Sequence, residues 1–197
     1  MFEIFAYIER MKYIRRWSLM RSLREETDME HSFQVAYVAH ALALIGNECY
    51  DKQYDVGGVL AMALYHDLPE TITGDMPTPI KYFRPEMRAV YGEIEKDASE
   101  RLLSTLPDSL KRAYRDAVDP NTQSDEYRLV KAADKISAYL KCLEETKGGN
   151  GEFRLAMEGK RAEIENIALN EVQYFMKEIV PVYSRSLDEL QITVSKE

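Results

Sequence analysis

Three histidines occur in the 197 residues, and their spacing gives them different roles. His31 begins an apolar helical stripe made of Val35, Val38, Ala39, Leu42 and Ile45. His40 lies nine residues later, and about 100° of rotation per residue turns it to the opposite face. His66 closes the apolar segment Val56–His66, which we expect to be a buried central helix. His31 and His66 can therefore meet from neighbouring helices, although each alone could equally be a satisfied core histidine.

An acid follows His66 directly, and a proline lies two positions further on. Adjacent side chains on a continuing helix diverge by about 100° and would aim poorly at one ion. Because Pro69 disfavours helical geometry at Leu68, we expect a bend there that lets His66 and Asp67 converge. A divalent cation then needs a second acid, and Asp134, inside a predicted helix, is a candidate. A surface salt bridge between Asp134 and a neighbouring lysine is the alternative.

These residues resemble the H…HD…D pattern of the HD-domain superfamily, whose members are all-helical, metal-dependent phosphohydrolases. The pattern is carried by Glu30-His31-Ser32, His66-Asp67-x-x-Glu70 and Ala133-Asp134. The sequence is also similar to the bacterial 5′-deoxynucleotidase family from about Arg10 to about Ile192. That similarity rests on four further segments in order and spacing: Arg16-Trp17, TGDMPTP at 73–79, LKCLEE at 140–145 and SLDE at 186–189.

The resemblance implies that His31, His66, Asp67 and Asp134 hold one divalent metal ion. Two imidazoles and two carboxylates suit a Mn²⁺, Co²⁺ or Zn²⁺ ion and leave positions open for water and substrate. Such an ion would polarise a phosphoryl oxygen, lower the pKa of bound water, or do both. By the same resemblance Glu70 is the general base, whereas a plain acidic residue in the first turn of the next helix is the alternative.

Positive charge is concentrated near the N-terminus of an otherwise acidic chain. Residues 1–24 carry six basic and two acidic side chains, whereas the whole chain has a net charge of −8. A solvated basic helix face is the ordinary explanation. The family resemblance instead assigns Arg16 to the phosphate and Trp17 to the 2′ side of the sugar, where a bulky ring disfavours a ribose hydroxyl. It implies further substrate contacts at His31, Asp67, Asp75, Met76, Pro77, Thr78 and Asp134.

Helices must position these side chains, because the helical period recurs along the chain and strand-like alternation is scarce. With Thr27 or Asp28 as the cap of the helix that carries His31, we predict further helical segments over Phe2–Ile14, Val56–His66, Pro85–Leu106, Asp108–Val118, Ser124–Thr146, Glu152–Asn170 and Val172–Val180. The glycine-rich run 148–151 is too short to separate domains, so we expect one domain over residues 1–197. The segment 187–197 could fray or dock.

Composition excludes several classes of protein. With 34 acidic against 26 basic residues, the chain is a poor candidate for binding a nucleic-acid polymer. The longest run without Asp, Glu, Lys or Arg, at 31–47, is too short and polar to span a membrane. Cys49 and Cys142 are too few for a disulfide scaffold, so we expect a reduced, cytoplasmic location. Rossmann, P-loop and hydrolase-elbow motifs are absent from the sequence.

The sequence thus predicts an all-α, metal-dependent 5′-nucleotidase that converts deoxyribonucleoside 5′-monophosphates (dNMPs) to deoxynucleoside and phosphate. One alternative is an HD phosphohydrolase acting on a cyclic nucleotide or an alarmone pyrophosphate. Another is a nucleotide-sensing module without turnover, against which Glu70 argues because a binding module needs no general base. By analogy with the family, we expect a homodimer whose amphipathic C-terminal region supplies the interface.

Overall fold

The protein is built from helices. The computed structural model describes residues 1–81 and 83–194, but not the side chains of Thr78, Lys81 and residues 192–194. Within these residues, extended backbone pairs only in an isolated antiparallel bridge between Arg15 and Thr27, and no helix is long and apolar enough to cross a membrane. The elements are α1 (Glu3–Arg10), η1 (Met11–Tyr13), α2 (Asp28–Cys49), α3 (Val56–Tyr65), α4 (Glu70–Thr73), α5 (Thr78–Lys81), α6 (Pro85–Leu103), α7 (Asp108–Val118), α8 (Asp125–Lys147), η2 (Gly151–Phe153), α9 (Arg154–Glu165), α10 (Asn170–Tyr174), η3 (Phe175–Ile179), η4 (Val180–Ser184) and α11 (Leu187–Val194).

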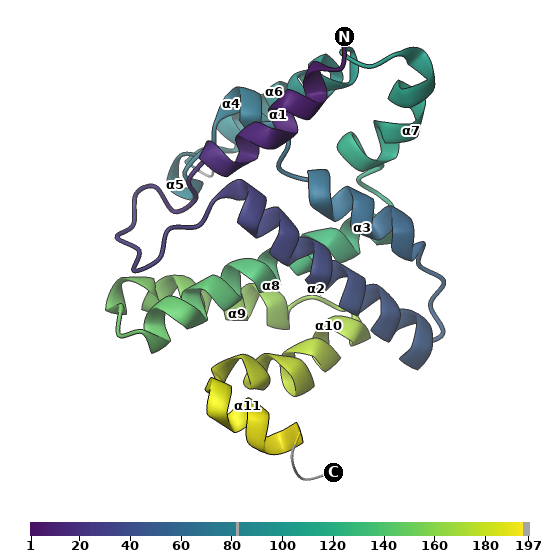
Figure 1. Cartoon of the computed structure of the whole chain (residues 1–197). Coiled ribbons are helices and arrows are strands. Elements are labelled where there is room, and N and C mark those ends of the chain that lie inside the picture. The colour runs from purple at the N-terminus through teal and green to yellow at the C-terminus, as the bar shows by residue number, and fades with distance from the viewer. Residues whose placement is uncertain (82, 195–197) are drawn as a thin grey trace.

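Helix α2 crosses the centre of the molecule and packs against both α3 and α8 (Figure 1). It begins with a capping box, in which the Thr27 hydroxyl accepts a hydrogen bond from the Glu30 N–H and the Glu30 carboxylate accepts one from the Thr27 N–H. Thr27 is therefore the cap, and Asp28 is the first helical residue. Four residues of the predicted apolar stripe are fully buried: Val35, Val38, Ala39 and Leu42.

The backbone bends at the position that the sequence predicts. Helix α3 ends at Tyr65, and tight turns follow in which the Leu68 N–H donates to the Tyr65 carbonyl and the Glu70 N–H to the Asp67 carbonyl, both at 3.0 Å. The chain enters α4 directly after Pro69. Because Leu68 is fully buried, it anchors this turn in the protein interior.

Two apolar clusters meet at this turn. The larger cluster is formed mainly by α2, α3, α8 and α10. The smaller one joins Leu68 to residues of α1, η1, α6 and α7. In Figure 1, α1, α4 and α6 lie together near the N-terminus, whereas α10 and α11 lie at the opposite end of the molecule. The turn after α3 therefore connects the two clusters, because the buried residues of α3 belong to the larger one and Leu68 belongs to the smaller one.

Several boundaries differ from the predicted ones. In α3 only Val59, Met62 and Ala63 are buried, because the helix packs on its neighbours along one face and is not enclosed. The predicted segment Glu152–Asn170 divides into η2 and α9, and α9 ends at Glu165. The four-residue helices α4 and α5 are too short to show a hydrophobic period, so the sequence did not reveal them.

The C-terminal region is more irregular than predicted. Val172–Val180 becomes the end of α10, a π-helical turn over η3 and the start of the 3₁₀ turn η4, near Pro181, which has no N–H to continue a helix. Ser186 and Glu189 then form a capping box that begins α11, since each side chain accepts a hydrogen bond from the other residue's N–H. The segment 187–194 is thus helical, whereas residues 195–197 lie outside the described part.

Candidate active site

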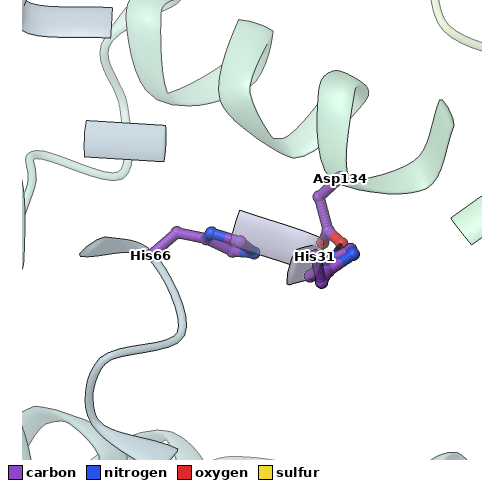
Figure 2. A group of neighbouring side chains, drawn as sticks. All are labelled: His31, His66 and Asp134. Atoms are coloured by element: carbon purple, nitrogen blue, oxygen red, sulfur yellow. Dashed lines mark hydrogen bonds and ion pairs between the residues drawn. The ribbon is translucent and has the colours of Figure 1, made fainter. Parts of the chain in front are cut away.

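Three helices bring two histidines and an aspartate to one point. His31 projects from α2, His66 follows the end of α3, and Asp134 projects from α8 (Figure 2). One ligand atom from each of the three lies within 4.8 Å of the others. His31 Nε2 is 3.1 Å from Asp134 Oδ1, and the two imidazole centroids are 5.3 Å apart. His40, in contrast, is a half-buried residue of α2 outside this cluster.

Asp67 joins the same cluster from the turn after α3. Its Oδ2 lies 3.1 Å from His66 Nε2 and 3.7 Å from His31 Nε2. The bend before Pro69 thus allows two consecutive residues to face one point, as the sequence predicts. Asp134 also forms the salt bridge that the sequence offers as the alternative to metal binding. Its Oδ2 lies 2.8 Å from Lys131 Nζ. One carboxylate therefore contacts both the lysine and the histidine.

Hydrogen bonds at Nδ1 determine which nitrogen of each histidine is free. The Ser137 hydroxyl donates to Gln34 Oε1, so its oxygen accepts from His31 Nδ1–H at 3.2 Å. His66 Nδ1–H donates to the Ala63 carbonyl at 2.8 Å. Both Nε2 atoms therefore carry the lone pair in the neutral ring, and this is the orientation that a metal ligand requires.

The titration of the two rings follows from their surroundings. Burial and the nearby Arg16 cation lower the pKa of His31 to about 4, so this ring is neutral at pH 7. Burial also favours the neutral form of His66, but the Asp67 carboxylate outweighs it and raises the pKa of His66. Burial would raise the pKa of Asp67, yet His66 and Arg16 hold it well below its usual range. The cluster thus offers ionised carboxylates, the lone pair of His31 Nε2 and a His66 ring whose Nε2 proton a bound divalent cation would displace.

A second group of carboxylates adjoins the first. Oxygens of Asp28, Asp67 and Glu70 lie within 4.8 Å of one another, and Asp28 is fully buried. No N–H or hydroxyl group of the described residues donates to Asp28 or to Oε2 of Glu70. Burial raises the pKa of Glu70 to about 11, together with the charges of Asp67, Asp28 and Asp75. Glu70 therefore needs added positive charge nearby before it can be ionised at neutral pH, and a cation at the adjoining cluster supplies it.

Arg16 is the cation that the chain itself places here. Its Nη1 lies 2.9 Å from Asp67 Oδ2 and 3.7 Å from Asp28 Oδ1, and its side chain is 15% exposed. Its Nε–H has no acceptor within hydrogen-bond distance, although a Glu26 oxygen lies 3.7 Å away. The guanidinium thus carries a buried N–H group that has no hydrogen-bond acceptor, at the edge of the cluster.

Trp17 lies beside Arg16 but is held differently. Its Nε1–H donates to Glu26 at 3.0 Å, and its ring packs on Phe153 with centroids 5.3 Å apart. Its backbone φ is +57°, in the left-handed region that a bulky side chain rarely adopts. The surrounding contacts must therefore hold the residue in this conformation.

The predicted loop after α4 only partly reaches the cluster. Asp75 acts on it electrostatically, since its charge contributes to the raised pKa values of Asp28 and Glu70. Gly74, with φ +74°, turns the chain out of α4. Met76 and Pro77 are half-buried, and their substrate contacts stay a prediction. The side chain of Thr78 lies outside the described part.

Sequence reasoning missed four polar residues that support the cluster: Asp28, Glu26, Ser137 and Gln34. Asp28 precedes His31 by one helical turn, and this i, i+3 spacing was the available signal. Ser137 has the same spacing from Asp134 on α8. Gln34 also has this spacing, because it follows His31 by three residues on α2. Glu26 had no such signal, because Arg16 and Trp17 are brought to it by the path of the loop before α2.

Comparison with known proteins places the chain in a family. A family model described as 5′-deoxynucleotidase YfbR-like matches residues 3–183. The chain belongs to the YfbR-like 5′-deoxynucleotidase family. Among YfbR-like proteins, it is 46% identical over 187 residues to 5′-deoxynucleotidases from Pectobacterium atrosepticum and Salmonella typhi, covering 94% of this chain and of each relative. It is 43% identical over 195 residues to one from Photorhabdus laumondii, covering 98% of this chain and 99% of that protein.

Solved structures share the fold of this chain. An HD-domain phosphohydrolase from Listeria innocua has a TM-score of 0.81 at 23% identity, over 98% of this chain and 96% of that one. A protein from Magnetospirillum magnetotacticum, described as a predicted metal-dependent phosphohydrolase, has a TM-score of 0.63 at 25% identity, over 96% of this chain and 90% of that one. The predicted all-α, single-domain HD fold is therefore confirmed. That this domain takes in all of residues 1–197 stays a prediction.

Loss of one ligand is expected to release the metal. If His31, His66, Asp67 and Asp134 share one ion, as the sequence predicts, His66→Ala or Asp134→Ala should lose bound metal and activity together. His40→Ala is the matched control, since this histidine of α2 lies outside the cluster and its loss should leave the metal content unchanged. Elemental analysis of the purified variants measures the metal content. Full occupancy in Asp134→Ala would count decisively against that ligand.

Ser137→Ala tests the orientation of the His31 ring. It removes the acceptor of His31 Nδ1–H but no ligand, so the affinity for the metal should fall roughly 10- to 100-fold while binding persists. Titration of the metal-depleted protein with Zn²⁺ or Mn²⁺ against a competing chelator gives the dissociation constant. An unchanged constant would show that Ser137 does not orient the ring.

Proposed function

We propose that this protein is a metal-dependent 5′-nucleotidase that hydrolyses dNMPs to deoxynucleoside and phosphate. The convergence of His31, His66, Asp67 and Asp134, with Glu70 and Arg16 beside them, carries this proposal. The curated relatives, named 5′-deoxynucleotidases at 43–46% identity over nearly their whole length, support the same substrate class. A cyclic nucleotide or an alarmone pyrophosphate is less favoured, because none of these relatives is named for such a substrate.

The roles of the side chains follow from their positions. A divalent ion held by His31, His66, Asp67 and Asp134 supplies Lewis acidity toward the phosphoryl group and acidifies water. Glu70 takes a proton from the attacking water. It can do so at neutral pH only when nearby positive charge opposes burial and the neighbouring carboxylates, which together raise the pKa of Glu70 to about 11. The water oxygen forms the new bond to phosphorus, and the 5′-oxygen of the deoxynucleoside leaves.

Arg16 and Trp17 supply the substrate contacts. Arg16 reaches the metal cluster at Asp67, so a phosphate bound there lies within reach of its guanidinium. Trp17 is next along the chain, and we assign its ring to the 2′ side of the sugar. Asp75, Met76, Pro77 and Thr78 belong to the loop that we assign to the nucleoside.

We further propose a homodimer that acts in the cytoplasm. Apolar side chains of η4 and α11 are exposed in the single chain, among them Val182, Tyr183, Leu187 and Leu190, and they suit a subunit interface. Both cysteines are unpaired, and this fits a reducing compartment.

Glu70→Ala separates water activation from metal binding. If Glu70 is the base and not a ligand, the variant should retain metal and substrate binding while kcat falls by roughly 10²- to 10⁴-fold. Steady-state phosphate release gives kcat, and elemental analysis gives metal content. A kcat within a few-fold of the unmodified enzyme would place water activation elsewhere, with the metal alone or with Asp75.

Trp17→Ala or Trp17→Val tests the preference for deoxyribose. A ribose hydroxyl facing the indole must clash or lose water without gaining a partner, and such a loss costs about 1–3 kcal/mol. Opening this space should bring the ratio of kcat/KM for a dNMP over its matching ribonucleotide toward unity, chiefly because the ribonucleotide improves.

Arg16→Ala is the matched comparison for Trp17→Ala. It should weaken both substrates alike, because both carry the same 5′-phosphate. Phosphate release from paired dNMPs and ribonucleotides gives the ratio for each variant. Equal losses on both substrates in Trp17→Ala, with the ratio unchanged, would make the ring a packing residue.

A further inference from the structure

The segment between η1 and α2 carries Arg16 and Trp17, and its two ends are tied to each other. The Arg16 N–H donates to the Glu26 carbonyl at 2.9 Å, and the Asp28 N–H donates to the Ile14 carbonyl at 3.0 Å. These bonds close the base of a loop that we call the 17–25 loop. The backbone groups in the middle of that loop bind instead to side chains from elsewhere in the chain.

The middle of the 17–25 loop is held by α8 and the turn that follows it. Glu145 Oε2 accepts a hydrogen bond from the Leu23 N–H at 2.8 Å, and its Oε1 accepts one from the Arg24 N–H at 3.2 Å. Asn150 Nδ2 donates to the Arg21 carbonyl at 2.7 Å. Lys141 Nζ donates to the Arg24 carbonyl. Four backbone groups of the loop thus bind to three side chains that lie more than a hundred residues away in the sequence.

These three side chains form a buried unit, which we call the α8 clamp: Lys141, Glu145 and Asn150. They are 4%, 1% and 8% exposed, and Lys141 Nζ lies 2.6 Å from Glu145 Oε1. Asn150 Nδ2 also donates to Glu145 Oε2 at 2.9 Å. Burial would raise the pKa of Glu145, but Lys141 and the loop amides lower it to about 2, so the carboxylate is ionised. Burying a charged pair is costly, and its bonds to the loop satisfy the remaining polar atoms.

Trp17 shows why the 17–25 loop needs an outside restraint. Its φ of +57° is strained for a bulky residue, and a strained conformation persists only when its surroundings over-determine it. The Trp17 ring packs on Phe153, which follows the clamp residue Asn150 closely in the sequence. The clamp and the platform for the indole therefore belong to the same stretch of chain.

We propose that the α8 clamp positions the substrate loop, and that Glu145, Lys141 and Asn150 thereby control substrate affinity and the preference for deoxyribose. None of the three joins the metal cluster, so they act through Arg16 and Trp17 and not on the reacting atoms. This inference rests on the proposed substrate contacts of Arg16 and Trp17. It gives the LKCLEE segment at 140–145 a function that hydrolysis at the metal does not require.

Glu145→Gln tests the proposal, with Glu144→Gln as the control. The amide introduced by this substitution keeps the size of the side chain but replaces one acceptor oxygen with a donor that faces the loop amides. The KM for a dNMP should rise roughly tenfold or more while kcat changes less than about twofold, because the loop positions substrate and does not take part in the chemical step. The ratio of kcat/KM for a dNMP over its ribonucleotide should fall. Glu144→Gln removes the same charge from the exposed neighbouring position, which touches the loop through a solvent-exposed ion pair of 4.0 Å with the Arg24 side chain, and it should leave KM and the ratio unchanged.

Tryptophan fluorescence gives a readout that is independent of activity. Trp17 is the only tryptophan, so emission excited selectively at the indole reports on the loop alone. In Glu145→Gln the emission should shift to longer wavelength and become more accessible to acrylamide, with unchanged metal content and far-UV circular dichroism. Unchanged emission and unchanged KM, or an equal rise of KM in Glu144→Gln, would overturn the proposal.

Asn150→Asp provides a second variant if Glu145→Gln does not fold. It keeps the oxygen that accepts from the Glu152 N–H but loses the donor to the Arg21 carbonyl, so the same rise in KM and shift in emission are expected. Parallel assays of Arg16→Ala and Trp17→Ala test the proposed substrate contacts separately from the clamp. If these leave KM and selectivity unchanged, the substrate assignment fails, and with it the positioning role. If KM or selectivity changes in Arg16→Ala and Trp17→Ala but in neither clamp variant, only the clamp proposal fails.

Discussion

Two imidazole Nε2 atoms and two ionised carboxylates face one another in this protein, and the negative charge gathered in this buried place is the constraint on which the site depends. His31 and His66 each donate Nδ1–H to a fixed acceptor, so Nε2 must face the carboxylates. Arg16 and Lys131 balance part of the negative charge. A divalent cation bound here would balance the rest, and it would also lower the pKa of Glu70 toward the range in which that residue can accept a proton.

The fold makes this arrangement stable by holding the four predicted ligands from three packed elements, which are α2, α8 and the turn after α3. The stripe of α2 and the buried face of α8 place His31 and Asp134 opposite each other. The turn after α3 is anchored by Leu68 in a separate apolar cluster, so His66 and Asp67 cannot move apart without disturbing that cluster. Rigid placement matters because a metal site tolerates little error in the aim of its ligands.

The 17–25 loop is held in place by different interactions. It has no regular secondary structure of its own, and its backbone polar groups are satisfied by a buried ion pair on α8 and by Asn150. The hydrolytic centre and the loop therefore depend on different parts of α8, with Asp134 and Ser137 in one and Lys141 and Glu145 nearer its C-terminal end. Changes in the clamp are expected to alter recognition without altering the metal centre.

The sequence by itself determined the helical class and the bend before Pro69, because these depend on local periodicity and on proline sterics. It left the cap of α2 open between Thr27 and Asp28, and the structure decides for Thr27. The four metal ligands stay a prediction that rests on a motif in register. The role of Glu70 as general base and the contact of Trp17 with the sugar stay predictions that rest on the family motif. Only the tertiary structure decided that Asp28 and Ser137 support the site, which histidine nitrogen is free, and that Glu145 holds the backbone of residues 23 and 24. The physical reason is distance along the chain. A hydrogen bond between groups about a hundred residues apart leaves no periodic trace in the sequence, and its geometry exists only after the helices have packed.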